Sequence, residues 1–299
     1  MDPGTQRENE PMRNSSRRTF LKTIGAAAAA VMTGAGRLAA APTKKPLGLQ
    51  LYSVRSLLPT DFDGTLAKVR ADGYTVVEAA GYYDHTAKDF RKSMDNAGLR
   101  CVSTHHNLSL LETQLDQWIE YGHELGLEYI ICSSSGGMHR NPEVKGPPTL
   151  DDWHWIAGEF NRIGEKVKAA GMQFGVHNHT PEFATIDNTL VYDELLRLTD
   201  PKLVIFEMDA GWVFASGHSP VDYLSKTPER FPLMHVKDMI PGADGKETMT
   251  VLGKGKVDFV PIMRAAAGLK YYFVEQEQFE MEPIEELKLN AEYMRHLGV

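Results

Sequence analysis

The stretch that decides the fold runs from residue 152 to residue 179 and reads DWHWIAGEFNRIGEKVKAAGMQFGVHNH. In its first part, apolar residues recur close to the 3.6-residue period of a helix, at Trp155, Phe160, Ile163, Val167 and Ala170. Gly171 follows them, in the position of a glycine that ends a helix. A short apolar run then leads into two histidines. The stretch therefore predicts a helix, a glycine stop and a strand, in that order.

Similar units recur along the chain. Eight short apolar runs rich in β-branched or aromatic residues lie at 47–54, 75–80, 100–106, 129–134, 173–179, 203–210, 233–238 and 271–277, with helical patterns between them. Such runs suit the strands of a parallel sheet that helices cover. Eight strand–helix units predict a single-domain α/β protein, a (β/α)₈ TIM barrel over residues 42–299. The alternative, a doubly wound open sheet, normally has a glycine-rich loop after its first strand, and LYSVRSLLP at 51–59 lacks one.

Residues 1–41 differ in character from the rest. The stretch SSRRTFLKTIGAAAAAVMTGAGRLAAAP at 15–42 has paired arginines, a mildly apolar alanine-rich part and a run of small residues. This order is typical of an export signal, and the apolar part is too short and too mild to span a membrane. Arg17 and Arg18, followed by Thr-Phe-Leu-Lys, resemble the bacterial twin-arginine signal, which carries folded proteins. We predict a signal peptide and linker over 1–41, no membrane span after its removal, and a periplasmic protein.

The charge balance and the cysteines exclude other classes of protein. With 32 basic and 40 acidic residues the net charge is -8, so the chain repels phosphate backbones and nucleic acid is not an expected partner. The two cysteines, Cys101 and Cys132, lie in separate apolar stretches and show no metal or redox spacing. We expect both to be buried thiols.

Polar residues end nearly every predicted strand. In a (β/α)₈ barrel the active site lies at the carboxyl ends of the strands. Those ends carry Gln50, Tyr52, Glu78, His105, His106, Ser133, Ser134, Ser135, His177, His179, Asp209, His235, Lys237, Glu275 and Glu277. Charge buried in a barrel mouth is unfavourable without a partner or a metal ion. The pattern therefore predicts a metal or substrate site.

A subset of these residues suits one metal ion. Asp209, His235 and Glu275 lie on successive predicted strands, about 4.8 Å apart, so their side chains can converge. Carboxylate and imidazole ligands together suit Mn²⁺, Zn²⁺, Co²⁺ or Fe²⁺. The fourth ligand is expected from GVHNHTPEF at 175–183, where His177 and His179 project to the same side of a strand. His177, the deeper, is the expected ligand; the alternative is a histidine pair whose members orient sugar hydroxyls or each other.

Four motifs in the second half resemble a known family. They are IFEMDAGW at 205–212, LMHVKDM at 233–239, VLGKGKVDF at 251–259 and YYFVEQE at 271–277. They resemble the xylose isomerase-like TIM barrel superfamily, which includes sugar-phosphate isomerases, ketose 3-epimerases, hydroxypyruvate isomerase and inosose dehydratase. In the epimerases one metal ion is held by Glu, Asp, His and Glu of successive strands, and the two glutamates exchange the substrate proton. The resemblance implies that Asp209, His235 and Glu275 are the last three of these ligands.

The chain departs from the epimerase pattern at two positions. His177 stands where an epimerase has glutamate, which removes one of the two acid/base carboxylates. This form resembles inosose dehydratase and the branch of the superfamily that acts on keto-sugars. Trp212 stands three residues after Asp209, where the epimerases and the DNA-repair endonucleases usually have histidine. The three-metal chemistry of DNA repair is therefore not expected.

The chemistry we predict is proton abstraction from a carbon beside a carbonyl that the metal ion polarises. Glu275 is the expected base because it is both a metal ligand and close to the substrate. Lys237 is expected to donate a proton to the oxyanion or to a leaving oxygen, and Glu78 is a candidate second acid. The residues expected to contact substrate are His105, His179, Trp212, Tyr82 and Glu182.

The reaction can end in two ways. Reprotonation gives an isomer or epimer, whereas expulsion of a β-oxygen gives dehydration or cleavage of a 3-keto-glycoside. We predict a divalent-metal-dependent sugar isomerase or epimerase that acts on an unphosphorylated keto-sugar, since no phosphate-binding nest is evident. A keto-sugar lyase or dehydratase is the first alternative. A non-catalytic periplasmic barrel that binds sugar or metal is the second, and the sequence leaves assembly into a homo-oligomer open.

Overall fold

The computed structural model describes Met1 and residues 45–135, 138–141, 143–242 and 247–298. The predicted signal peptide over 1–41 lies, apart from Met1, outside the described residues. The chain divides into two units, Met1–Thr43 and Lys44–Val299. All the helices and strands of the described residues belong to the second unit.

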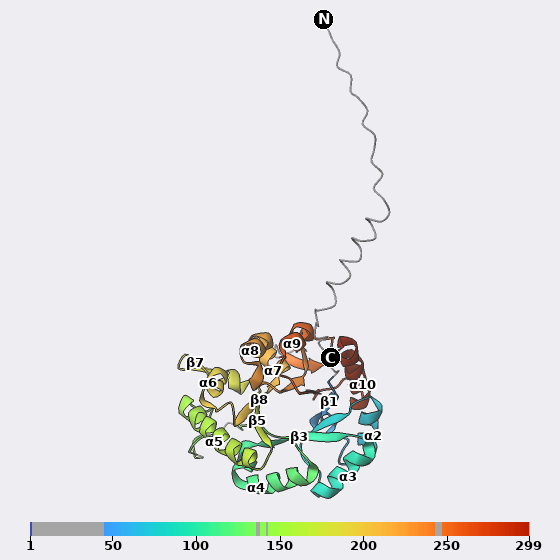
Figure 1. Cartoon of the computed structure of the whole chain (residues 1–299), viewed down its shortest axis with the longest axis horizontal. Coiled ribbons are helices and arrows are strands. Elements are labelled where there is room, and N and C mark those ends of the chain that lie inside the picture. The colour runs from blue at the N-terminus through green and yellow to red at the C-terminus, as the bar shows by residue number, and fades with distance from the viewer. Residues whose placement is uncertain (2–44, 136–137, 142, 243–246, 299) are drawn as a thin grey trace, which may run out of the picture. The chain divides into compact units, whose positions relative to one another are not determined.

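Eight parallel strands form a closed barrel in this unit (Figure 1). They are β1 (Leu47–Gln50), β2 (Val76–Ala79), β3 (Arg100–Asn107), β4 (Tyr129–Ser134), β5 (Gln173–His177), β8 (Val204–Asp209), β9 (Leu233–Val236) and β12 (Tyr271–Val274). Each strand pairs with the next barrel strand along the chain, and β12 pairs with β1 to close the barrel. The predicted (β/α)₈ barrel is confirmed, and the open doubly wound sheet is excluded.

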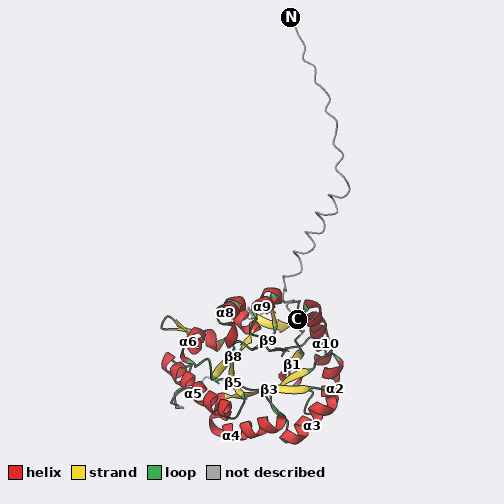
Figure 2. Ribbon diagram, viewed as in Figure 1, coloured by secondary structure: helices red, strands yellow, loops and turns green. Residues whose placement is uncertain are grey.

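Helices surround the barrel as an outer ring (Figure 2). They are α2 (Phe62–Ala71), α3 (Ala87–Ala97), α4 (Leu108–Leu125), α5 (Leu150–Ala169), α6 (Val191–Leu198), α7 (Ala210–Ala215), α8 (Pro220–Lys226), α9 (Phe259–Ala265) and α10 (Pro283–Leu297). Gly98 and Gly126 end α3 and α4 in the left-handed conformation. Within the described residues, no helix combines the length and apolar character that crossing a bilayer requires.

Short elements lie in the loops that connect the strands and helices of the barrel. They are the 3₁₀ turns η1 (Leu51–Val54), η2 (Pro181–Phe183) and η3 (Pro228–Arg230) and two hairpins, β6 (Thr185–Ile186) with β7 (Thr189–Leu190) and β10 (Asp238–Pro241) with β11 (Glu247–Thr250). The first predicted strand, 47–54, is therefore shorter than expected. It ends at Gln50, whose side chain accepts a hydrogen bond from the amide of Tyr52 and starts the turn.

The helix of the opening stretch packs through a face slightly rotated from the predicted one. Its buried residues include Trp153, Ile156, Phe160 and Ile163, whereas Trp155 is only half-buried. Thr149 begins the helix because its hydroxyl accepts a hydrogen bond from the amide of Asp152, whose carboxylate bonds back to the amide of Thr149.

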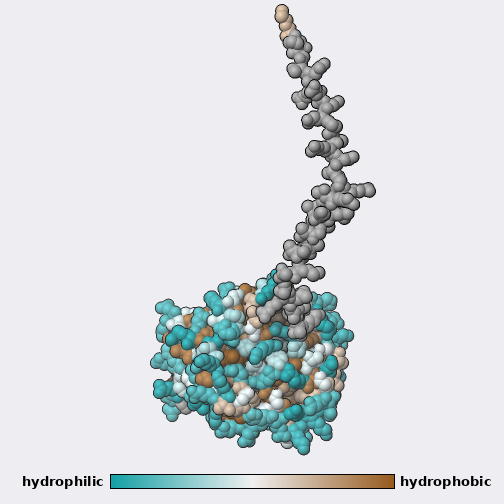
Figure 3. Space-filling view, viewed as in Figure 1, coloured by the Kyte–Doolittle hydropathy of each residue, from teal (hydrophilic) through white to brown (hydrophobic). Residues whose placement is uncertain are grey.

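Two separate apolar clusters stabilise the barrel. The larger lies between the strands and the helices. The smaller consists of strand residues that point into the barrel: Val76, Val102, Tyr129, Ile131, Ile205, Leu233 and Phe273. Gly175 lies among them, where a Cβ atom would be 2.4 Å from Ile205 and 2.7 Å from Ile131, so a larger residue would displace these two side chains. On the face drawn in Figure 3, hydrophilic residues predominate and apolar residues form small separate patches.

The motif VLGKGKVDF forms a loop that wraps around one carboxylate. Asp238 Oδ2 accepts hydrogen bonds from the amides of Gly253 and Gly255, at 2.8 and 2.9 Å. Its Oδ1 accepts from the amides of Met239 and Val257, at 2.9 and 3.0 Å. Asp238 is almost fully buried. This one side chain therefore fixes the loop that leads from the β10–β11 hairpin to α9.

We predict that Asp238→Ala lowers the free energy of unfolding by about 2–4 kcal/mol, because several partly buried amides lose their acceptor. Urea denaturation followed by circular dichroism measures this loss. Lys256→Ala, an exposed change in the same loop, is the control and should leave the denaturation midpoint unchanged. Equal midpoints for Asp238→Ala and the native protein would contradict this role.

Candidate active site

The strand alternation that fills the barrel also builds a polar layer above it. On β8 the inward residues are Ile205, Glu207 and Asp209, and on β9 they begin with Leu233 and His235. On each of these strands, the inward-facing residues are apolar near the amino end and ionisable near the carboxyl end. We call the resulting set the polar layer: Glu78, His105, His177, Glu207, Asp209, His235, Lys237 and Glu275. All except His105 are buried, and His105 is nearly so.

Glu207 is the member of the polar layer that the sequence analysis missed. Its Oε2 lies 2.7 Å from His105 Nε2, 3.1 Å from His177 Nδ1 and 3.2 Å from His235 Nε2. The signal was present in the sequence, because Glu207 stands two residues before Asp209 on the same strand and must project to the same side. One carboxylate thus gathers three imidazoles.

His235 lies between carboxylates on both of its ring nitrogens. Its Nδ1 is 2.8 Å from Glu275 Oε2, and its Nε2 is 2.7 Å from Glu78 Oε1. Glu78 is in turn held by Gln50, whose amide nitrogen lies 2.7 Å from the carboxylate, and by the hydroxyl of Ser103. Glu78 therefore orients His235, and its Oε1 also lies 2.8 Å from His105 Nε2.

Lys237 is fully buried and pairs with three carboxylates. Its ammonium nitrogen lies 2.9 Å from Asp209 Oδ2, 2.9 Å from Glu275 Oε2 and 2.9 Å from Glu277 Oε1. It also lies 5.1 Å from the ring centre of Trp212. These contacts explain how a lysine can lie inside a barrel, since a buried ammonium without partners would be strongly unfavourable.

Charge pairing divides the imidazoles into two kinds. Burial lowers the pKa of His105 and His235, but their carboxylate neighbours outweigh burial, raising the pKa of His105 to about 9 and that of His235 well above its usual value. Burial and the neighbouring His235 lower the pKa of His177 far below its usual value. Burial raises the pKa of Glu207, but His235 and His105 outweigh it and bring the pKa to about 2. At neutral pH, His105 is cationic and His177 is neutral.

Two overlapping groups of donor atoms are close enough to hold a metal ion. The first is His105, His177, Glu207 and His235; the second is the predicted set His177, Asp209, His235 and Glu275. In each group the donor atoms lie within 4.8 Å of one another, and ligand atoms around a tetrahedral ion with bonds of roughly 2.1 Å are about 3.4 Å apart, so movements of about an ångström bring them onto one ion. A metal ligand must be deprotonated. Neutral His177 already meets this requirement, whereas His235, whose pKa is raised, has to release its proton when an ion binds. With that proton released, the donor set fits a divalent ion.

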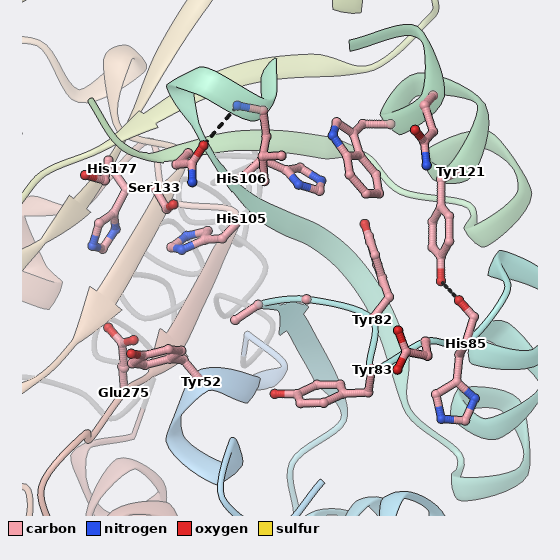
Figure 4. A pocket seen from close by; sticks show the side chains of 18 of the residues that line it. Tyr52, Tyr82, Tyr83, His85, His105, His106, Tyr121, Ser133, His177 and Glu275 are labelled. Atoms are coloured by element: carbon pink, nitrogen blue, oxygen red, sulfur yellow. Dashed lines mark hydrogen bonds between the residues drawn. The ribbon is translucent and has the colours of Figure 1, made fainter. Parts of the chain in front are cut away.

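A cavity of about 790 Å³ opens beside the polar layer. Figure 4 shows Glu275, His177 and His105 at one end and Tyr82, Tyr121 and His85 at the other. Glu275 and Glu277 line it from the end of β12, and His105 lines it from β3. Glu78, Glu207, Asp209, His235 and Lys237 are not among its lining residues. The cavity thus meets the polar layer at only a few side chains.

The five residues expected to contact substrate separate into two groups. His105, His179 and Tyr82 line the cavity. Trp212 and Glu182 are not among the lining residues. Glu182 accepts a hydrogen bond of 2.9 Å from the amide of His179, and the amide of Trp212 donates one of 2.9 Å to Asp209. Glu182 thus holds the segment that carries His179, and Trp212 lies against Asp209.

The family is shown by a match to most of the barrel. Residues 66–297 match the model of the xylose isomerase-like TIM barrel family, and the chain belongs to this family. Residues 14–34 match the model of the twin-arginine translocation signal sequence, which implies export. The resemblances drawn from the four motifs and from the paired arginines are both confirmed.

Relatives within the family carry different names. An inosose dehydratase from Geobacillus kaustophilus is 26% identical in an alignment 269 residues long, which covers 79% of this chain and 87% of that protein. A crystal structure of a sugar phosphate isomerase/epimerase from Parabacteroides distasonis is 28% identical with a TM-score of 0.70, covering 85% of this chain and 94% of that one. The IOLI protein with a zinc atom shares the fold at 13% identity and a TM-score of 0.64, covering 84% and 97%.

Asp209 and Glu207 each belong to only one of the two donor groups. We predict that replacing each in turn shows which group holds the ion. Asp209→Asn should lower affinity for Mn²⁺ or Zn²⁺ by more than the ~10–100-fold typical of residues outside the direct ligands. Glu207→Gln should have a smaller effect. Metal content after dialysis, measured by mass spectrometry of the elements, compares the variants. The reverse order would assign the ion to the group that contains Glu207 and His105.

A second prediction concerns acid stability. Burial lowers the pKa of His106 to about 3, with a smaller effect of the neighbouring His105. The unfolded chain therefore takes up the proton first, near its ordinary value of about 6.5, and stability falls as the pH drops below that value. His106→Phe keeps a ring and removes this site, so its loss of unfolding free energy between about pH 7 and pH 5 should be smaller by about 2 kcal/mol. Urea denaturation at both pH values measures the difference; equal losses would contradict it.

Proposed function

We propose that the protein is a divalent-metal-dependent enzyme that removes a proton beside the carbonyl of an unphosphorylated keto-sugar and then expels a β-oxygen. The observation that carries this proposal is the pairing of unlike groups on the cavity wall. Glu275 offers a carboxylate from the end of β12, and His105 offers a cationic imidazole from β3. Elimination requires a deprotonated base and a protonated acid at the same pH, and this pair of side chains provides both.

Glu275 is the proposed base. Burial raises its pKa, but Lys237 and His235 outweigh burial and hold the pKa well below its usual value, so the carboxylate stays ionised. It is the carboxylate of the polar layer that lines the cavity. Lys237 is enclosed by carboxylates and does not line the cavity. We therefore propose that Lys237 positions Glu275 and keeps it ionised, and that it does not donate a proton to the substrate.

His105 is the proposed acid. Its Nε2 lies between Glu78 Oε1 and Glu207 Oε2, at 2.8 and 2.7 Å. These two buried carboxylates hold the Nε2 proton and keep the ring cationic, so the proton that passes to a leaving oxygen is the one on Nδ1. In this arrangement Glu78 acts through His105 and His235 and does not touch the substrate, which differs from the predicted role of a second acid.

We propose that His177, Asp209, His235 and Glu275 hold the ion, with Mn²⁺, Zn²⁺, Co²⁺ or Fe²⁺ as candidates. When bound, it supplies Lewis-acid stabilisation of the negative charge that develops on the substrate. The neutral state of His177 and the carboxylates of Asp209 and Glu275 support this assignment. The matched signal sequence supports a periplasmic site of action.

Isomerisation or epimerisation is the second candidate, and the likeness to the sugar phosphate isomerase/epimerase supports it. Two-base epimerisation needs a second base across the substrate from the first. Glu207 does not serve, because it is fully buried, bonded to imidazoles and absent from the cavity wall. The likeness to inosose dehydratase supports elimination instead.

We predict that Glu275→Gln lowers the rate of proton exchange by about 10²–10⁴-fold, the usual contribution of a general base. His105→Gln should retain exchange at the carbon beside the carbonyl but slow the loss of the β-oxygen. Proton NMR of a panel of keto-sugars in deuterated water follows both events in one sample.

The same experiment separates the alternatives. Exchange without loss of oxygen in the native protein, with an isomer as product, would support the isomerase. Saturable sugar binding without exchange for any member of the panel would support a binding protein. Full activity of Glu275→Gln would refute the assignment of the base.

A further inference from the structure

The cavity extends well beyond the polar layer. Its volume of about 790 Å³ lies in the upper part of the ~300–1,000 Å³ range of pockets that enclose drug-sized ligands. A single six-carbon sugar is much smaller than such ligands. A keto-sugar held against Glu275 and His105 therefore leaves the far end of the cavity unfilled.

That far end is built from rings. We call it the aromatic arm and define it by five lining residues: Tyr82, Tyr83, His106, Trp118 and Tyr121. Tyr82 stacks on Tyr121 with ring centres 3.9 Å apart, and His106 stacks on Trp118 at 4.4 Å. Figure 4 shows Tyr82 and Tyr121 on the side of the cavity away from Glu275 and His177. Flat apolar faces of this kind suit a ring-shaped ligand.

The stacked pair of His106 and Trp118 also has unused polar atoms. His106 Nε2 and Trp118 Nε1 are buried and have no hydrogen-bond partner among the described residues. His106 is only 5% exposed. Buried polar atoms nearly always have partners, so a hydroxyl group of a ligand, or a water molecule, that reached these two ring nitrogens would complete their hydrogen bonding.

The loop that forms the rim of the arm has an unusual backbone. Tyr83 and Asp84 have positive φ angles of 51° and 62°, and both line the cavity. Positive φ is uncommon for residues other than glycine and occurs both in tight turns, as at Asp187 and Asn188 between β6 and β7, and at functional sites. By contrast, the hydroxyls of Tyr82 and Tyr121 are used within the protein, on Thr104 Oγ1 at 2.8 Å and on the carbonyl of His85 at 3.0 Å. The arm is thus a fixed wall.

We propose that the aromatic arm binds a second ring, joined to the keto-sugar through a glycosidic oxygen, so that the substrate is a keto-glycoside of two rings. This inference rests on the proposed function of the polar layer. Expulsion of a β-oxygen requires the carbonyl to lie two carbons from the carbon that bears the glycosidic oxygen.

The reaction then balances without a further reactant. The C–H bond beside the carbonyl breaks and its proton goes to Glu275, while its electron pair forms the carbon–carbon double bond. The C–O bond to the second ring breaks, and the oxygen keeps that electron pair and takes a proton from His105. The products are an unsaturated keto-sugar and the second ring as a free alcohol.

A matched series of substrates tests the arm. The series keeps one keto-sugar and changes the group on the glycosidic oxygen from methyl to phenyl to a second sugar ring. The metal-loaded full chain should use at least one ring-bearing member about tenfold better than the methyl member in kcat/KM. Which ring is preferred distinguishes an aryl glycoside from a disaccharide. Equal use of all three would overturn the proposal.

Variants of Trp118 provide a second test of the aromatic arm. Trp118→Leu removes the ring face, so the preference for ring-bearing substrates over methyl should fall about tenfold, whereas Trp118→Phe should retain most of it. Glu120→Ala, an exposed change on the same helix, is the control, and thermal unfolding checks that each variant folds. A full preference in a folded Trp118→Leu protein would overturn the proposal.

If the proposed function of the polar layer is wrong, the substrate series gives a result that differs from failure of the aromatic arm. In that case no member of the series exchanges a proton in deuterated water. Calorimetric titration with the corresponding glycosides that lack the keto group then tests the arm alone. Tighter binding of phenyl or disaccharide glycosides than of the methyl glycoside, lost in Trp118→Leu, supports the arm, and equal affinities overturn it.

Discussion

The contact of the Lys237 ammonium with three carboxylates is the interaction on which the site depends. A fully buried lysine persists only because Asp209, Glu275 and Glu277 lie within 2.9 Å of its nitrogen. The same contacts hold Glu275 in its ionised form against the effect of burial. A charged base is thereby kept ready in an environment that would otherwise favour its neutral form. Stability and the proposed chemistry thus depend on the same ion pairs.

The closed barrel supplies the geometry that these ion pairs require. Parallel strands place all carboxyl ends at one rim, and their two-residue alternation sends apolar side chains into the barrel below and ionisable ones above. Different strands of the barrel then contribute side chains of different charge. β3 brings the cationic His105, β5 the neutral His177 and the end of β12 the anionic Glu275. A cationic imidazole and a carboxylate therefore face one cavity although they are far apart in the sequence.

Much of this arrangement could be predicted from the sequence, and the reasons for the exceptions are physical. Periodicity and strand-end chemistry predicted the eight strands, the barrel and the grouping of His177, Asp209, His235 and Glu275, which the structure brings close together. Glu207 was missed because it stands inside an apolar run, where only its spacing from Asp209 shows which way it points. The aromatic arm was also missed as a unit, since Tyr83, Trp118 and Tyr121 come from a loop and a helix whose packing no local pattern encodes. Lys237 was expected to reach the substrate, but three carboxylates enclose it.

The proposed chemistry requires one divalent ion held by His177, Asp209, His235 and Glu275, beside a cavity that His105 also lines. A crystal structure of the protein loaded with Mn²⁺ or Zn²⁺, with anomalous scattering recorded at the absorption edge of that metal, tests this requirement most directly. We expect one anomalous peak within bonding distance of those four side chains. A peak among His105, Glu207 and the two shared histidines instead, or no peak in crystals of catalytically active protein, would contradict it.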